Sequence, residues 1–278
     1  PAEFGRVPGL ALAVALAALA LSHCTAAHAA RDGLLLHLKL DETSGAQAFE
    51  DASGNGFHAR CGDAVPCPRA GDGAALFRLS ASHWEWLEVP HTPDLEPGRE
   101  MTVAVWIYPA NAIWQGGRPV KIGGGKIVGK TNARFDGGWV LGTDVRRGSL
   151  KYSLYPEIWD SSGKQHVFRA GSFGFQEWPH LALTWRSGDR MIGYVNGRKV
   201  KSISASNRPI GKNRNPLRVA IAPWDTNALA FGGGVDDLRI YERTLNAGEI
   251  QRLFTAGRPS ANTDGDLPKP PRPEILRE

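Results

Sequence analysis

The chain has 278 residues, of which 42% are hydrophobic and 22% charged, a composition typical of a soluble globular protein. It excludes a wholly disordered chain, a collagen-like chain and a disulfide-dense miniprotein. The formal net charge of +5 gives a mildly basic surface, which favours encounter with acidic partners but says nothing about the fold. The 33 glycines and 19 prolines predict many turns between strands, and therefore an all-β architecture.

The first 30 residues have the pattern of a secretory signal peptide. An apolar run over residues 7–21 leads to the small-x-small sequence Ala27-His28-Ala29. We therefore expect cleavage near Ala29 or Ala30 and export, to a secreted, periplasmic or cell-surface location. The alternative, a transmembrane anchor, is disfavoured because about 15 apolar residues are fewer than the roughly 20 that a span needs.

Export changes how the cysteines are interpreted, because Cys24 lies in the segment that would be removed. A lipid anchor on Cys24 is an alternative, although His23 stands where such a site has Gly or Ala. The mature chain would keep Cys61 and Cys67, which flank a Pro-containing turn. Such spacing suits a local disulfide in an oxidising compartment. A zinc site would need further Cys or His at ligand spacing, and the sequence offers none nearby.

The body of the chain, residues 31–257, predicts a series of short strands separated by turns rich in Gly, Asn, Asp and Pro. The spacing indicates an antiparallel sandwich rather than βαβ units. Asn196-Gly197 is a strong hairpin signal between two of these strands. The expected strands are 34–40, 84–89, 101–108, 126–129, 139–141, 150–155, 167–169, 180–186, 191–195, 199–203, 217–222 and 235–241.

One short helix is predicted near the end of this region. Asn246 and Glu249 have capping-box spacing, and Ile250, Leu253 and Phe254 follow at helical spacing. Residues 258–278 are rich in proline and charge and have no apolar period, so we expect a flexible tail.

Nine segments carry a resemblance to a known family. They are 40–45 (LDETSG), 51–56 (DASGNG), 86–90 (WLEVP), 102–109 (TVAVWIYP), 126–130 (KIVGK), 178–185 (WPHLALTW), 194–197 (YVNG), 234–241 (GVDDLRIY) and 243–250 (RTLNAGEI). In this order they resemble the laminin-G-like jelly-roll domains of the concanavalin A-like lectin/glucanase superfamily. The resemblance covers residues 33–255 and implies a two-sheet antiparallel jelly-roll sandwich. It does not imply one function, because the superfamily holds adhesins, glycan-binding modules, hydrolases and lyases.

A structural calcium site is the best-supported chemical site, and such an ion is common in the resembling family. Asp41, Asp51, Asn55 and Asp236 supply the hard oxygen ligands that Ca²⁺ prefers. The first and last strands of a jelly roll commonly lie side by side, which would bring Asp236 towards Asp41. The alternative is that Asp51 and Asn55 make Asx-turns and that Asp236 pairs with Arg239.

A formal match to a phosphate-binding loop, residues 124–131 (GGKIVGKT), does not indicate nucleotide binding. That loop needs a strand before it and a helix directly after it, whereas here the match is itself strand-like and is followed by helix-breaking residues. An exported protein also meets little ATP. We expect neither nucleotide nor nucleic acid as a partner.

Aromatic residues in connections between strands or, for Tyr155, at the end of an expected strand suggest a glycan platform. Trp114, Tyr155, Trp159 and Trp224 have flat apolar faces that can stack on sugar rings while neighbouring polar groups bind hydroxyls. The alternative is that these loops fold back onto the sandwich. Five cations are candidates to face uronate or sulfate groups, the alternative being a solvated basic surface; they are Arg118, Lys121, Arg146, Arg147 and Lys164.

Catalysis has weaker support. Glycoside hydrolases need two suitably spaced carboxylates, and the E-x-D-x-E triplet of the related glucanases is absent. If the protein is an enzyme, Glu157, Asp160 and Asp225 are the candidate acid and base groups. The sequence therefore predicts an exported, calcium-stabilised module that binds an extracellular glycan, or another polymer, through aromatic loops over a concave sheet. A polysaccharide hydrolase or lyase using the same cleft, and a protein–protein adhesion domain, are the alternatives.

Overall fold

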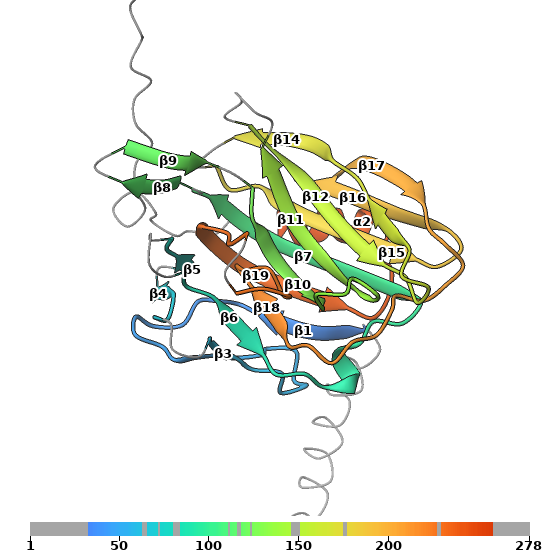
Figure 1. Cartoon of the computed structure of the whole chain (residues 1–278), viewed down its shortest axis with the longest axis horizontal. Helices are drawn as coiled ribbons and strands as arrows, with labels where there is room; N and C mark the ends of the chain where they lie inside the picture. Colours follow the sequence, from blue (N-terminus) through green and yellow to red (C-terminus); the bar gives the residue numbers. More distant parts are fainter. Residues whose placement is uncertain are drawn as a thin grey trace, which may run out of the picture.

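The computed structural model describes residues 33–62, 66–71, 73–79, 84–110, 112–115, 118–122, 124–145, 151–174, 177–226 and 229–257. The expected signal peptide and the proline-rich tail lie outside these residues. The described chain forms two antiparallel sheets that pack face to face, with one α-helix, as expected for a jelly-roll sandwich (Figure 1).

The first sheet has eight strands and contains both the first and the last strand of the domain. Leu38 of the first strand lies opposite Leu238 of the last, so the expected side-by-side placement of the two chain ends is observed. The strands, in order across the sheet, are β17 (Arg198–Ser204), β16 (Arg190–Val195), β15 (His180–Arg186), β7 (Glu100–Pro109), β19 (Gly233–Tyr241), β5 (Ala74–Phe77) and β4 (Arg69–Gly71), with β1 (Leu34–Leu38) paired to β19.

The second sheet has nine strands and carries the candidate site. In order they are β13 (Gln165–Val167), β12 (Lys151–Trp159), β11 (Gly138–Val145), β10 (Lys126–Thr131), β18 (Leu217–Val219), β6 (Leu87–Val89), β3 (Ala59–Cys61) and β2 (Ala48–Phe49), with β14 (Ala170–Gly174) paired to β12. A separate hairpin is formed by β8 (Ala112–Gln115) and β9 (Arg118–Ile122). Some strands were not expected from the sequence, because they are short or lack clear alternation. They are β2, β3, β4, β5, β8, β9 and β14.

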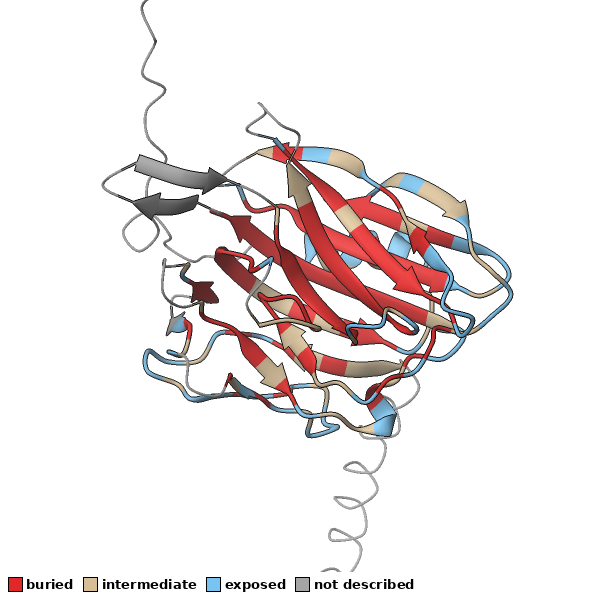
Figure 2. Ribbon diagram, viewed as in Figure 1, coloured by how far each residue is buried: buried red, intermediate tan, exposed pale blue. Residues whose placement is uncertain are grey.

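The hydrophobic core lies between the two sheets, and the central strands of both sheets are buried along most of their length (Figure 2). The tryptophans that fall in strand positions, or just before a strand, are Trp86, Trp106, Trp139, Trp178 and Trp185, and all of them are buried. A bound sugar would therefore have to use the other tryptophans.

Two local signals act as the sequence predicts. Asn196 and Gly197 both have positive φ (50° and 73°), as the two-residue turn between β16 and β17 requires. The Asn246 side chain accepts a hydrogen bond from the Glu249 backbone, and the Glu249 side chain accepts one from the Asn246 backbone. This capping box starts α2 (Ala247–Thr255).

The helix distinguishes the outer faces of the two sheets. Ile250 of α2 is fully buried against Tyr194 and Tyr241 of the first sheet. In the part of the chain that the structure describes, no helix covers the outer face of the second sheet. None of the described helices is long and apolar enough to span a membrane.

Candidate functional site

Strand β12 presents a mixed aromatic and charged surface because its side chains alternate. Leu154 and Ile158 point into the core between the sheets. Tyr155, Glu157 and Trp159 stand two residues apart and therefore point to the outer face of the second sheet. The sequence analysis placed Trp159 in a connection, but it is the last residue of the strand and only 5% exposed.

An ion pair stands on this outer face. The ammonium of Lys126, from β10, contacts Oε2 of Glu157, and Gln165 Nε2 donates to Glu157 Oε1 over 3.1 Å. Lys126 reaches across Gly142 of β11, where a Cβ atom would lie 3.2 Å from the lysine Cδ. The absence of a side chain at Gly142 thus leaves room for the lysine. Both charged residues are largely buried, at 7% and 8% exposure.

Aromatic rings surround this ion pair. Lys126 Nζ lies 5.1 Å from the centre of the Tyr155 ring and 5.6 Å from that of Trp224, both within cation–π range. Phe135 packs edge-on against Trp224 with ring centres 4.9 Å apart and stacks on Trp159 at 5.2 Å. We call these residues, with Glu157 and Gln165, the aromatic face.

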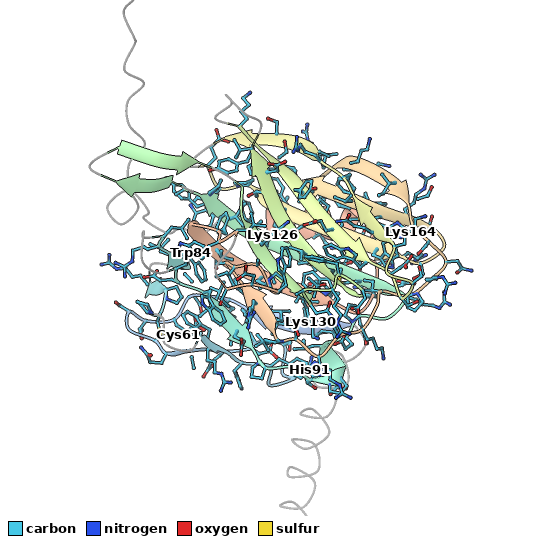
Figure 3. The ribbon with its side chains drawn as sticks, viewed as in Figure 1. Cys61, Trp84, His91, Lys126, Lys130 and Lys164 are labelled. Atoms are coloured by element: carbon cyan, nitrogen blue, oxygen red, sulfur yellow. A yellow bond between two sulfur atoms is a disulfide. The ribbon has the colours of Figure 1, made fainter. Side chains whose placement is uncertain are left out.

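The aromatic face is open enough for a ligand to reach it. Tyr155, Phe135 and Trp224 are each partly exposed, and Gln165 is exposed. Burial, and after it the nearby Glu157 carboxylate, raise the pKa of Tyr155 above its ordinary value. The phenol therefore remains protonated and can donate a hydrogen bond at neutral pH. Figure 3 labels Lys126 near the middle of the second sheet.

Asp160 belongs to a different network from Glu157, although only three residues separate them. Its carboxylate accepts hydrogen bonds from the Ser162 hydroxyl (2.5 Å) and the Ser206 hydroxyl (2.6 Å), and contacts His166 (3.2 Å). Burial alone would raise its pKa, but these hydrogen bonds outweigh burial and hold the pKa well below the usual range. Asp160 therefore anchors a turn, and its expected role as a catalytic acid stays a prediction.

The remaining predicted ligand-binding and catalytic residues are placed less centrally. Trp114 lies in β8, where the structure describes the backbone but not the side chains. Asp225 is partly exposed and adjacent in sequence to Trp224. Of the cations, Lys164 is exposed on the turn anchored by Asp160. The other four lie outside the described residues or in β9, where only the backbone is described; they are Arg118, Lys121, Arg146 and Arg147.

Two of the four predicted calcium ligands are used in turns. Asp51 accepts hydrogen bonds from the backbone N–H groups of His37 (2.9 Å), Ser53 (2.9 Å) and Phe57 (3.0 Å). Asn55 donates through Nδ2 to the carbonyl of Leu35 over 2.9 Å. The contact between Ser53 N–H and Asp51 is the Asx-turn that the sequence offered as the alternative, and the assignment of Asp51 and Asn55 as metal ligands stays a prediction.

The other two predicted ligands, Asp41 and Asp236, lie close enough to repel each other. Burial is the largest cause that raises the pKa of Asp236, to about 7, and the Asp237 and Asp41 carboxylates raise it further. Asp237, rather than Asp236, bonds to Arg239 (2.9 Å). Among the described residues, no group of three or more acidic, His or Cys side chains is arranged to hold a metal. The pair is nevertheless electrostatically suited to a cation.

Cys61 and Cys67 are joined by a disulfide, with Cα atoms 5.2 Å apart. The bond closes a short loop beside β3. A loop of this length contributes little through chain entropy, so its main effect is local.

Sequence reasoning missed three contributors to the aromatic face: Lys126, Phe135 and Gln165. Lys126 fell in an expected strand, a family-resemblance segment and the phosphate-loop match, and Phe135 in a helix-breaking stretch, but neither was a candidate for ligand binding. Their importance depends on which strands lie side by side, which no local pattern specifies.

A family model for the concanavalin A-like lectin/glucanases superfamily matches residues 84–251. The chain belongs to this superfamily. Comparison with curated proteins finds none that matches the chain. The family assignment agrees with the observed jelly roll, and it leaves the function open because the fold hosts several.

Solved structures of toxin binding domains share the fold. The binding domain of Paraclostridial Mosquitocidal Protein 1 matches with a TM-score of 0.60 and 19% identity, over 81% of this chain and 52% of that one. The binding domain of botulinum neurotoxin DC, solved with rat synaptotagmin II, gives 0.54 and 14%, over 81% and 52%.

A structure of botulinum neurotoxin type C, whose cell entry depends on interaction with two ganglioside molecules, gives a TM-score of 0.56 and 14% identity, over 81% and 51%. The present chain thus spans about half the length of each of these structures. At these identities, the likeness describes the fold.

Proposed function

We propose that this chain is an exported glycan-binding module whose ligand lies on the aromatic face. The observation that carries the proposal is the placement of the Tyr155 and Trp224 rings around the Lys126 ammonium, on an outer sheet face that no described helix covers. The rings offer apolar surface for the faces of sugar rings. Glu157, Gln165 and the Tyr155 hydroxyl offer acceptors and donors for sugar hydroxyls.

The charged pair supports binding more than catalysis. Both oxygens of Glu157 already have donors, from Lys126 and Gln165. Asp160, three residues further along the chain, is held by its own hydrogen bonds. Glycoside hydrolysis needs a second carboxylate opposite the first. The likeness to domains that bind gangliosides, which carry glycans, or a protein receptor is compatible with a binding role.

Export is supported by the Cys61–Cys67 disulfide, because such bonds persist in oxidising compartments. The partner proposed is accordingly an extracellular polysaccharide or glycan.

The experiment is a screen of neutral and acidic polysaccharides by affinity electrophoresis of residues 31–257, with Ca²⁺ present and with analysis of the sugars afterwards. We expect retardation by at least one glycan and no released oligosaccharides. Release of oligosaccharides would instead establish the hydrolase or lyase alternative. No retardation by any glycan, with stable co-purification of an envelope protein, would favour an adhesion domain.

We also propose that Asp41 and Asp236 hold a structural Ca²⁺, which would neutralise their mutual repulsion. Asp51 and Asn55 are not part of this proposal, since their side chains are engaged in turns. Backbone carbonyls and water would have to complete the six to eight oxygen ligands that the ion takes.

The Asp236→Asn variant tests the calcium proposal. Because the native pKa of Asp236 (about 7) exceeds the unfolded value of about 3.9, the native state binds more protons between these values. Stability therefore falls as pH rises from about 4 to about 7 and stays low above it. In EDTA at pH 8, we expect the variant to be more stable than wild type by about 2 kcal/mol, with convergence near pH 4.

Millimolar Ca²⁺ should raise the melting temperature of wild type and leave that of Asp236→Asn unchanged. The variant keeps the side-chain oxygen that accepts from the Asp237 backbone N–H (2.8 Å), so local geometry is preserved. A wild-type melting temperature that is the same in EDTA and in Ca²⁺ would refute the site.

A further inference from the structure

A second polar site lies at one end of the sandwich. The short 3₁₀ helix η1 (Pro93–Leu95) and the segment before β18 border an open pocket on the surface. Figure 3 shows Lys130 and His91 at this end of the molecule, away from Lys126. The residues that line the pocket are His91, Pro93, Glu96, Lys212, Asn213 and Arg214.

The floor of the pocket is a buried ion pair. Lys130, whose side chain is fully buried, contacts Oε1 of Glu96 through its ammonium and donates to the Asn213 carbonyl over 2.8 Å. The Asn213 backbone N–H donates to Glu96 Oε2 at 3.4 Å. Glu96 lines the pocket, but its carboxylate already accepts hydrogen bonds from Lys130 and from the Asn213 backbone. The Lys130 ammonium neutralises its negative charge.

The walls of the pocket are fixed to the end of β10. Asn213 Nδ2 donates to the Lys130 carbonyl over 3.2 Å, and Asn215 Nδ2 donates to the Thr131 carbonyl over 3.0 Å. The side chains on either side of Asn213 therefore project from a backbone that is held in place.

The mouth of the pocket carries positive charge that forms no ion pair within the described part of the chain. Lys212 and Arg214 are exposed, and neither forms an ion pair with any described residue. His91 Nδ1 is buried without a hydrogen bond and lies 3.7 Å from Glu96 Oε1. Since the charges of Glu96 and Lys130 cancel, the pocket as a whole is positive. Arg214 offers the fork of donors that suits a planar or tetrahedral oxyanion.

We propose that this pocket binds the carboxylate or sulfate group of an acidic sugar residue, with Lys212 and Arg214 as its direct partners. The inference rests on the proposed glycan function and narrows the ligand to an acidic chain. The two sites are neighbours: Gly211, beside Lys212, lies against the Asp136–Gly137 backbone of the turn that also carries Phe135. Lys126 and Lys130 are four residues apart on β10, roughly 13 Å along the strand. One oligosaccharide can thus contact both.

The test uses titration calorimetry in about 150 mM salt, where long-range attraction between exposed charges is screened. The probes are a fully sulfated hexasaccharide, a hexagalacturonate and a neutral hexasaccharide. The pocket variant is Lys212→Gln/Arg214→Gln. The matched control is Lys199→Gln/Lys201→Gln, which removes two equally exposed charges from β17.

We expect the pocket variant to bind one or both acidic probes up to about 30-fold more weakly, since each exposed ion pair is worth up to about fivefold. The control should stay within about threefold of wild type. The acidic probe whose affinity falls in the pocket variant shows whether the pocket prefers sulfate or carboxylate. Equal losses in both variants would mean diffuse electrostatics, and equal wild-type affinity for acidic and neutral probes would mean no anion recognition; either result overturns the proposal.

A Trp224→Ala variant separates this proposal from the one on which it rests. If acidic binding needs Lys212 and Arg214 but not Trp224, the anion pocket stands and the aromatic face fails. The opposite outcome is that binding of the neutral probe requires Trp224, with every probe binding the pocket variant as tightly as wild type. In that case the aromatic face is supported and the proposal of an anion pocket is overturned.

Discussion

Lys130→Met is expected to lower the free energy of unfolding by about 3–5 kcal/mol, which is typical for breaking a buried ion pair. Lys130 is 1% exposed, and its ammonium contacts the nearly buried Glu96. Burial lowers the pKa of Lys130, and the contact with Glu96 opposes that shift. Methionine fills most of the space but leaves the Glu96 carboxylate buried without a counter-charge. Urea denaturation at pH 7 measures the loss.

The control for this prediction is a double-mutant cycle with Glu96→Gln. Glutamine keeps an oxygen for the Asn213 backbone N–H and removes the charge that Lys130→Met would strand. The double variant should therefore be more stable than the sum of the single losses by about 2 kcal/mol. If Lys130→Met costs less than about 1 kcal/mol, the pair is not buried as described.

Asp160→Asn is expected to cost about 2–3 kcal/mol at pH 7, because it removes a buried ionised acceptor that is bonded to three side-chain donors. Ser162, Ser206 and His166 lose a charge-assisted partner. The native pKa of Asp160 lies below its unfolded value, so at acid pH the unfolded state binds the extra proton. The stabilisation is complete above about pH 5 and is lost as the pH falls below about 4.

The measurement is urea denaturation of wild type and Asp160→Asn at several pH values between 7 and 3. The difference between them should shrink towards the acid end. Asp189→Asn serves as the matched control, since Asp189 is exposed and should change stability by less than about 0.5 kcal/mol. A pH-independent difference for Asp160→Asn would show that its charge is not what stabilises the turn.

The fold followed from the sequence because its signals are local. Turn residues separate alternating strands, Asn196-Gly197 specifies a hairpin, and Asn246 with Glu249 starts the helix. The family resemblance added the placement of the first strand beside the last, which the pairing of β1 with β19 confirms. The two-residue strand β2 and the three-residue strands β3 and β4 escaped prediction, because they are too short to show a period.

The site followed only in part. Tyr155, Glu157 and Trp224 do lie on the outer face of the second sheet. Asp160, directly after β12, is hydrogen-bonded to Ser162 instead. Lys126 joins Glu157 only because β10, β11 and β12 are neighbours in the sheet. Gly142 leaves room for the Lys126 side chain to cross β11 to Glu157. A glycine in a strand does not itself predict which side chain will lie over it. Pairing of this kind depends on tertiary structure rather than on residue spacing.

The anion pocket was invisible for a similar reason. Lys212 and Arg214 lie in a polar stretch that looks like an ordinary solvated loop. Their significance comes from Lys130 and Glu96, which are 34 residues apart and meet beneath them. The refused phosphate-loop match thus contained two lysines with structural consequences, neither of them for a nucleotide.

The most direct test of the central claim is the affinity of the best-bound neutral oligosaccharide for wild type, Trp224→Ala and Tyr155→Phe, measured by titration calorimetry. Removing an aromatic anchor typically costs about 2 kcal/mol, so Trp224→Ala should weaken binding about 30-fold. Tyr155→Phe keeps the ring but removes the hydroxyl, so it should weaken binding only about fivefold, the usual net worth of one hydrogen bond. A Trp224→Ala variant that is folded and binds as tightly as wild type would contradict a ligand site on the aromatic face.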